Sequence, residues 1–281
     1  MNLRNLGTRT IAGIVYVALV LLGILVNKIL FAIIFSVFLG LALYEFYKLA
    51  DNNIMNRLSK VFNIVAGILV FVSTIYYENI YTAGFLFLLY LIFIITTTVF
   101  DKNENQLKRT ITSIFGQVYI TIPLLLLSTL VIAKNEQITF SIFVLIWIND
   151  TAAYLVGSMF GKHKLLERIS PKKTIEGFIG GIVFTVAAGL LLAKIAPSIF
   201  SNSISFNSAF IVDYNYLYWA LFAFIVSVFG TIGDLFESLI KRTYSVKDSG
   251  KIIPGHGGIL DRIDSVLLAI PAIYFFHILI S

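Results

Sequence analysis

The chain has 281 residues, of which 58% are hydrophobic and only 13% are charged. A soluble domain has about half its residues apolar and about a quarter charged, so this composition excludes a single water-soluble core. The sequence contains no cysteine, which excludes disulfides and thiolate metal sites. The net charge of +6 would suit a nucleic-acid partner, but the positions of the basic residues favour a different explanation.

The apolar residues form uninterrupted runs, each long enough to cross a bilayer as a helix. Continuous apolarity without alternation argues against a membrane β-barrel. The sequence therefore predicts an all-α, polytopic transmembrane helical bundle. About nine spans are expected, approximately at 11–26, 29–49, 61–77, 80–100, 111–133, 140–156, 178–193, 216–232 and 263–280.

The basic residues alternate between the loops in a way that sets the orientation of these spans. With the N-terminus inside, only Lys28, Lys134 and Lys194 of the 21 Lys and Arg residues fall outside, as the positive-inside rule requires. We therefore expect a multi-pass protein of the bacterial inner membrane with a cytoplasmic N-terminus. The basic excess then faces anionic lipid headgroups, and no nucleic-acid partner is expected.

Carboxylates at membrane depth are costly and usually face a cavity or a partner. Asp150 ends one apolar helix, and Asp234 and Glu237 lie at the cytoplasmic end of another. Glu45 and Lys48 lie three residues apart near a helix end, and we interpret them as an ordinary ion pair. Asp150, Asp234 and Glu237 therefore mark the predicted functional region.

Two long inside loops adjoin these acids. In the first, Ser170 and Pro171 are typical of a helix start, so Lys172, Lys173 and Thr174 are expected near a helix N-terminus, where phosphate binds well. A purely anchoring basic loop is the alternative for this segment.

The second loop, which runs from Ser238 to Asp264, is richer in charge. If the preceding helix continues, Asp234, Ser238 and Lys241 share one face. Asp261 and Asp264 share a face at the start of the last span. Between these two sets of residues lies Pro254-Gly255-His256-Gly257-Gly258, a predicted turn whose glycines permit positive φ and close approach of the backbone to an anion.

This inventory suits metal-assisted transfer of a phosphate-containing group. Carboxylate oxygens suit Mg²⁺, which completes its coordination with water and substrate phosphates. Lysine and arginine neutralise the remaining phosphate charge. Positioning and charge neutralisation are the protein's main tasks in such chemistry.

The second loop resembles the characteristic stretch of phosphatidate cytidylyltransferases, also called CDP-diacylglycerol synthases. The matching residues are Ser238, Lys241, Arg242, Lys247, Asp248, Pro254, Gly255, His256, Gly257, Gly258, Asp261, Arg262 and Asp264. The segments 150–154 and 170–177 also look like that family, so the close resemblance covers about the C-terminal half. The resemblance implies that CTP and phosphatidic acid react, with Mg²⁺, to give CDP-diacylglycerol and pyrophosphate.

The resemblance and the residue types together suggest roles at an active site that faces the cytoplasm. The expected metal ligands are Asp234 and Asp261, followed by Asp150 and Asp264. The expected catalytic residues are Asp234, Lys241, Arg242, Lys247, Asp248, His256, Asp261 and Arg262. The expected substrate-binding residues are Ser170, Lys172, Lys173, Thr174, Ser238, Gly255, Gly257 and Gly258.

Two other functions stay open from the sequence. A CTP-using lipid kinase would transfer the γ-phosphoryl group and release CDP. A transporter would carry charges along several spans near the midplane, whereas here they gather at helix ends. We expect one integral domain over 1–281, with N-terminal spans at 1–135 and catalytic spans at 136–281, and a possible homodimer.

Overall fold

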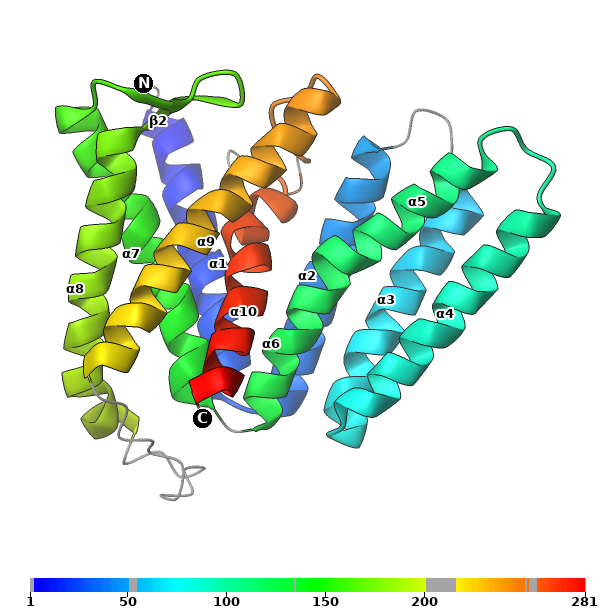
Figure 1. The fold of residues 1–281 in the computed structure, drawn as a ribbon, viewed down its shortest axis with the longest axis horizontal. Coiled ribbons are helices and arrows are strands. Elements are labelled where there is room, and N and C mark those ends of the chain that lie inside the picture. The colour runs from blue at the N-terminus through cyan, green and yellow to red at the C-terminus, as the bar shows by residue number, and fades with distance from the viewer. Residues whose placement is uncertain are drawn as a thin grey trace. The chain divides into compact units, whose positions relative to one another are not determined.

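The computed structural model describes residues 3–50, 55–133, 135–200, 216–250, 252 and 257–280. These residues are almost entirely helical (Figure 1), which confirms the predicted fold class. The elements in chain order are α1 (Leu3–Leu25), α2 (Lys28–Leu49), α3 (Arg57–Tyr77), α4 (Ile80–Phe100), α5 (Gln106–Gly116), η1 (Gln117–Thr121), α6 (Ile122–Ile132), α7 (Glu136–Phe160), β1 (Lys164–Leu166), β2 (Ser170–Thr174), α8 (Ile175–Phe200), α9 (Tyr216–Thr243) and α10 (Leu260–Ile280).

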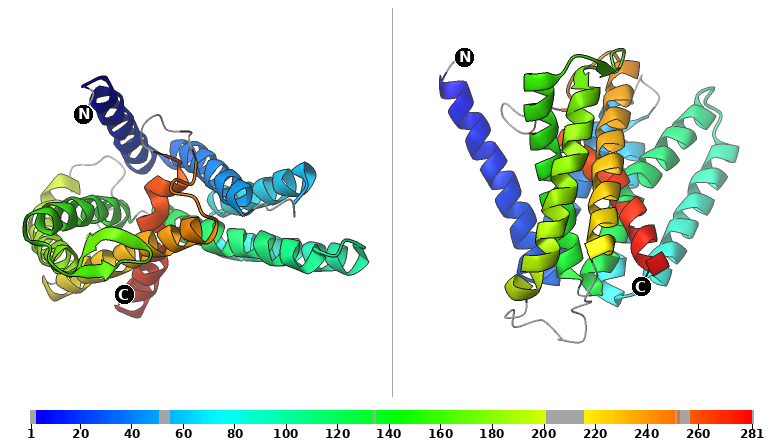
Figure 2. Two further views of the ribbon diagram at one scale, coloured as in Figure 1. Left: turned by 90° about the horizontal axis from the view of Figure 1, so that it is seen from above. Right: turned by 60° about the vertical axis from the view of Figure 1, so that its left-hand side comes forward.

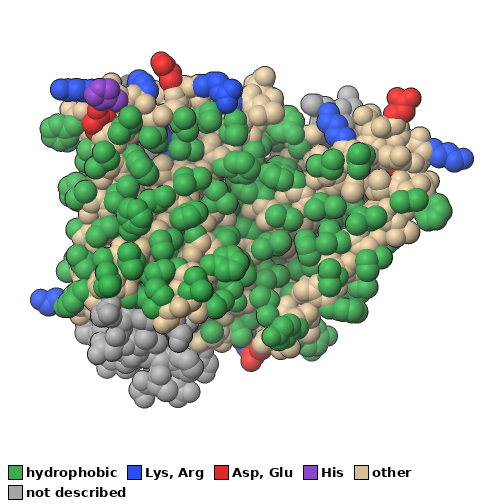
Figure 3. Space-filling model, viewed as in Figure 1, with side chains coloured by type: hydrophobic (Ala, Val, Ile, Leu, Met, Phe, Trp, Pro, Cys, Tyr) green, Lys and Arg blue, Asp and Glu red, His purple; other side chains and the backbone are tan. Residues whose placement is uncertain are grey.

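The chain is a multi-pass membrane protein. Eight helical segments of the described chain are long and apolar enough to cross a bilayer, and 10–25 within α1 is a shorter apolar helix. These correspond to the nine predicted spans. On the face shown in Figure 3, hydrophobic side chains cover the helices along their length and charged side chains gather at helix ends. The cytoplasmic position of the N-terminus stays a prediction.

The chain divides into two compact units. Unit 1 comprises 1–132 and 243–263, and unit 2 comprises 133–242 and 264–281. In unit 1, α3 packs against α2, α4 and α6, and α1 packs against α2. In unit 2, α7 and α8 form a tightly packed antiparallel pair, and the two-stranded antiparallel sheet of β1 and β2 connects them at one end (Figures 1 and 2).

Asparagine residues begin three helices of unit 1. The side-chain oxygens of Asn27, Asn56 and Asn79 accept hydrogen bonds from backbone N–H groups in the first turns of α2, α3 and α4. Asparagine is a favoured N-cap because its oxygen satisfies an amide that has no partner within the helix. These caps stabilise the first turns of α2, α3 and α4.

A buried polar network surrounds the π-helical turn η1 in unit 1. Gln117 Nε2 donates to the Asn63 carbonyl oxygen over 2.6 Å, and Thr121 Oγ1 donates to Gln117 Oε1 over 2.7 Å. The Tyr90 hydroxyl donates to Asn63 Oδ1, and Asn63 Nδ2 donates to Ser113 Oγ. Because its polar groups pair with one another, we interpret this network as structural rather than as a second functional site.

Gln117→Leu is expected to reduce the free energy of unfolding by about 1–3 kcal/mol, because it removes the centre of this network and leaves buried partners unpaired. Unfolding in detergent–lipid micelles measures the change. The control Val118→Leu alters an exposed neighbouring side chain and is expected to change stability by less than about 0.5 kcal/mol. A Gln117→Leu protein as stable as the wild type would contradict a structural role for the network.

Candidate functional site

The first basic loop forms a strand rather than the predicted helix start. Residues Ser170–Thr174 are strand β2, paired antiparallel with β1, and α8 begins only at Ile175. Thr174 begins this helix, since its Oγ1 accepts the Gly177 N–H over 3.1 Å. The expectation that Ser170 and Pro171 open a helix was therefore wrong. The reason is that Thr174 provides the N-cap, while Pro171 lies in a two-stranded ribbon that tolerates a missing N–H.

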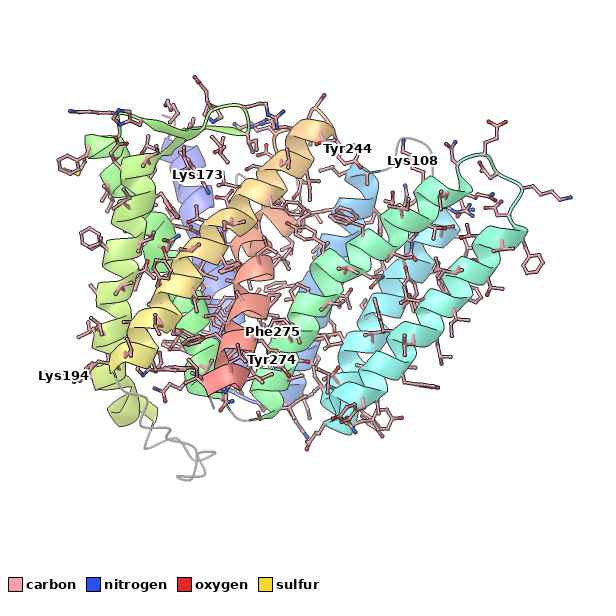
Figure 4. The ribbon with its side chains drawn as sticks, in the orientation of Figure 1. Lys108, Lys173, Lys194, Tyr244, Tyr274 and Phe275 are labelled. Atoms are coloured by element: carbon pink, nitrogen blue, oxygen red, sulfur yellow. The ribbon has the colours of Figure 1, made fainter. Side chains whose placement is uncertain are left out.

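The ribbon directs a lysine to α9. Lys173 Nζ lies 2.6 Å from Asp234 Oδ2, and both side chains are partly exposed. Ser238 Oγ, one turn further along α9, donates to Asp234 Oδ1 over 3.4 Å. Figure 4 shows Lys173 at the strand-bearing end of α8 and Lys194 at the opposite end. The predicted functional lysine and carboxylate therefore meet at one end of unit 2.

The last turns of α9 carry a second, more deeply buried ion pair. Glu237 is fully buried, and its carboxylate pairs with Lys241. The exposed Arg242 donates through Nε to the Ile169 carbonyl oxygen over 3.4 Å, which fastens the ribbon to α9. The predicted continuation of the helix past the apolar span is confirmed, because α9 extends to Thr243. Lys241, however, bonds to Glu237 rather than to a group exposed on the surface.

A buried asparagine joins α7 to α9 next to Asp150. Asn149 Oδ1 accepts from Ser227 Oγ over 2.5 Å, and its Nδ2 donates to Thr231 Oγ1 over 3.3 Å. The next residue, Asp150, is exposed. The amide of Asn149 thus fixes the rotation of α7 against α9. The expectation that Asp150 ends the helix was wrong, because α7 continues to Phe160.

Asp264 completes a group of carboxylates on three helices of unit 2. Asp234, Glu237 and Asp150 all act on it electrostatically. Gly233 allows α9 and α10 to approach closely, since a Cβ there would lie 2.6 Å from the Asp264 carbonyl oxygen. Lys173 pairs with Asp234 and Lys241 with Glu237, and these two positive charges offset part of the repulsion between the carboxylates.

Unit 1 contains the rest of the motif that the structure describes. Asp261 Oδ2 accepts hydrogen bonds from Ser249 N, Ser249 Oγ and Gly258 N over 3.0, 3.0 and 2.7 Å. Gly257 has a φ of 89°, which confirms the positive φ expected of this turn. Lys247 and Asp248 are exposed and Arg262 is partly buried. Gly255 and His256 lie outside the described residues.

Sequence reasoning missed Glu45 as a candidate. Its carboxylate is fully buried and binds Ser249 Oγ and Leu260 N, while Lys48 is exposed and lies over the Tyr44 ring. The expected Glu45–Lys48 pair was therefore wrong. The available signal was a lone acid in an apolar helix, which by itself points to a partner within the protein.

The carboxylate oxygens of unit 2 are suitable ligands for a hard divalent ion whose remaining ligands would come from the substrate. Within the described ranges, no three or more Asp, Glu or His side chains form a group that could hold a metal. Mg²⁺ usually takes only one or two carboxylates and completes its shell with water and phosphate oxygens. Asp234, Asp150 and Asp264 are suitable donors for such an ion. Their metal roles, and that of Asp261, stay predictions.

Carboxylates and lysines gathered at one end of an apolar helical unit are typical of membrane enzymes that bind phosphate groups together with a metal. A model of the cytidylyltransferase family matches residues 7–280 of this chain. The chain therefore belongs to the cytidylyltransferase family.

Three relatives carry the same printed name, phosphatidate cytidylyltransferase. The protein of Staphylococcus haemolyticus is 32% identical over 283 residues, which cover 96% of each chain. That of Bacillus subtilis is 46% identical over 138 residues, or 49% of this chain and 46% of the relative. That of Staphylococcus aureus strain COL is 37% identical over 182 residues, or 63% of each.

Gly233→Ala is expected to lower both thermal stability and enzymatic activity, because the added methyl group would collide with the backbone of α10 beside Asp264. Overpacking of this kind costs about 1–3 kcal/mol. The matched control is Gly84→Ala, since a Cβ at that position meets nothing within 4 Å. Equal melting temperatures and activities for the two variants would show that the approach of α9 to α10 does not position the carboxylates.

Proposed function

We propose that the protein transfers the cytidylyl group of CTP to phosphatidic acid, giving CDP-diacylglycerol and pyrophosphate. The family match and the names of the relatives support this proposal. The observation that carries it structurally is the meeting of Lys173 with Asp234 beside the carboxylates of α7 and α10. That arrangement suits a polyphosphate that arrives with its own divalent ion.

The proposed reaction needs no nucleophile from the protein. A phosphate oxygen of phosphatidic acid attacks the α-phosphorus of CTP, the bond from the α-phosphorus to the bridging oxygen breaks, and pyrophosphate leaves with that oxygen. The attacking group is already anionic, so no serine, cysteine or histidine has to be activated. The task of the protein is to bring two anionic substrates together and to neutralise the charge that develops.

Mg²⁺ bound by Asp234 with Asp150 or Asp264 would neutralise phosphate charge and polarise the α-phosphoryl group. Lys173 is held by Asp234 and Lys241 by Glu237, so both ammonium groups are oriented before substrate arrives. We assign Lys173 to a substrate phosphate, because the ribbon of β1 and β2 holds it against Asp234. The role of the exposed Lys172 in binding a substrate phosphate stays a prediction. The roles of Lys247, Asp248, His256, Asp261 and Arg262 stay predictions from the motif.

The bilayer supplies one substrate and the aqueous phase the other, so the reaction has to occur at a membrane surface. The basic ribbon and the charged end of α9 lie at the same end of unit 2. We propose that this end faces the cytoplasm, where CTP is available, as the positive-inside rule suggests. The homodimer also stays a prediction.

The proposed reaction is tested with purified full-length protein in detergent–phosphatidate micelles, given Mg²⁺ and CTP labelled separately at the α- and γ-phosphates. We expect α-label in the lipid product and γ-label in pyrophosphate. Removal of divalent ions with EDTA should abolish both, and added Mg²⁺ should restore them. Transfer of γ-label to a lipid with release of CDP would instead identify a lipid kinase, and no transfer to any lipid would favour transport.

A further inference from the structure

Glu45 of α2 lies far in sequence from the motif but is joined directly to it within unit 1. Its Oε2 accepts the Leu260 N–H over 2.9 Å and the Ser249 hydroxyl over 3.2 Å. Leu260 is the first residue of α10. The carboxylate therefore lies against the positive end of a helix dipole, which favours a negative charge there.

The two glycines that flank this contact leave room for it. A Cβ at Gly258 would collide with Glu45 Oε2 and Ser249 Oγ, and a Cβ at Gly250 would collide with Glu45 Oε1. Glycine at these positions thus lets the backbone approach the carboxylate without a side chain in between. The close fit to the Glu45 carboxylate therefore occurs at two separate glycines, Gly250 and Gly258.

Ser249 connects Glu45 to a second carboxylate. Its hydroxyl also lies 3.0 Å from Asp261 Oδ2, the oxygen that accepts the Ser249 and Gly258 N–H groups. Glu45 and Asp261 together bind the amides of Ser249, Gly258 and Leu260. The two carboxylates thus bind three described backbone amides of the motif segment.

Space filling alone does not account for Glu45. The side chain is 1% exposed, and among the residues that the structure describes its Oε1 has no hydrogen-bond partner. Burial of a carboxylate is costly, and a hydrophobic side chain of similar volume is often as stable or more stable at such a position. The benefit has to come from what Oε2 holds in place.

We propose that Glu45 is a positioning residue for the reaction: it clamps Ser249 and the start of α10 to α2, and so fixes Asp261. The catalytic part of this inference rests on the proposed function, whereas the clamp itself does not. Two measurements on the same full-length protein separate them. The rate of hydrogen exchange at the backbone amides measures whether Glu45 holds the segment in place. The turnover number for CTP measures whether this contact matters for the reaction.

Glu45→Leu keeps the packing and removes the acceptor. We expect exchange at the Ser249, Gly258 and Leu260 amides to accelerate about tenfold or more, as loss of a hydrogen bond to a charged group implies. Turnover should fall by a similar factor while the melting temperature and exchange in α3 and α4 stay unchanged. Glu45→Gln retains one acceptor oxygen and is expected to restore part of both losses.

The matched control is Glu78→Gln, which alters an exposed carboxylate that pairs with Lys28 elsewhere in unit 1. It should leave turnover and the three amides unchanged. Gly258→Ala provides an independent disruption, because its methyl group would displace the Glu45 carboxylate, and it should also accelerate exchange at Ser249 and Leu260.

Unchanged exchange at all three amides in both Glu45 variants would overturn the clamp. Faster exchange with wild-type turnover would overturn the positioning role. If the wild-type protein transfers no cytidylyl group, the proposed function fails, and the exchange rates alone then decide whether Glu45 holds the turn.

Discussion

The structure depends on the cost of placing carboxylates at the ends of apolar helices. Each such group has to find compensation within the protein, because lipid offers none. Asp234 finds it in Lys173, Glu237 in Lys241, and Glu45 in an amide and a hydroxyl. Glycines at positions 250 and 258 leave room for the Glu45 carboxylate, and the glycine at position 233 lets α9 approach the backbone of α10 beside Asp264.

Much of the fold was predictable because membrane helices follow from local composition. Long apolar runs define the spans. The asparagines before α2, α3 and α4 mark where those helices begin, but the span predictions did not use them, so the span of α3 was predicted from 61 rather than from Arg57. The positive φ at Gly257 was also predictable from local sequence, because glycine adopts positive φ without strain. The pairing of Ser238 with Asp234 followed from helical spacing.

The parts that could not be predicted depend on contacts between distant segments. Ser170 and Pro171 have the local signature of a helix start, but the pairing of Ser170 with Leu166 of β1 makes the segment a strand. Glu45 and Lys48 have the spacing of a pair, but Ser249, 204 residues away, competes successfully for the carboxylate. In both cases tertiary structure overrides a correct local preference.

The lysines of this site are held before substrate arrives, and that has a mechanistic consequence. An ammonium already oriented by a carboxylate loses less conformational freedom when a phosphate binds. When substrate binds, Asp234 would then release Lys173 and bind a divalent ion instead. In the proposed mechanism, the ion pairs are the resting arrangement of a phosphate site as well as stabilising interactions.

The most direct test of this account is the metal preference of Asp234→Cys. The wild-type chain contains no cysteine, so the new thiolate is the only one present. If Asp234 binds the ion that accompanies CTP, activity with Mg²⁺ should be lost and Cd²⁺, which prefers sulfur, should restore part of it in the variant but not increase activity in the wild type. A variant with wild-type activity and an unchanged preference for Mg²⁺ would contradict the central claim.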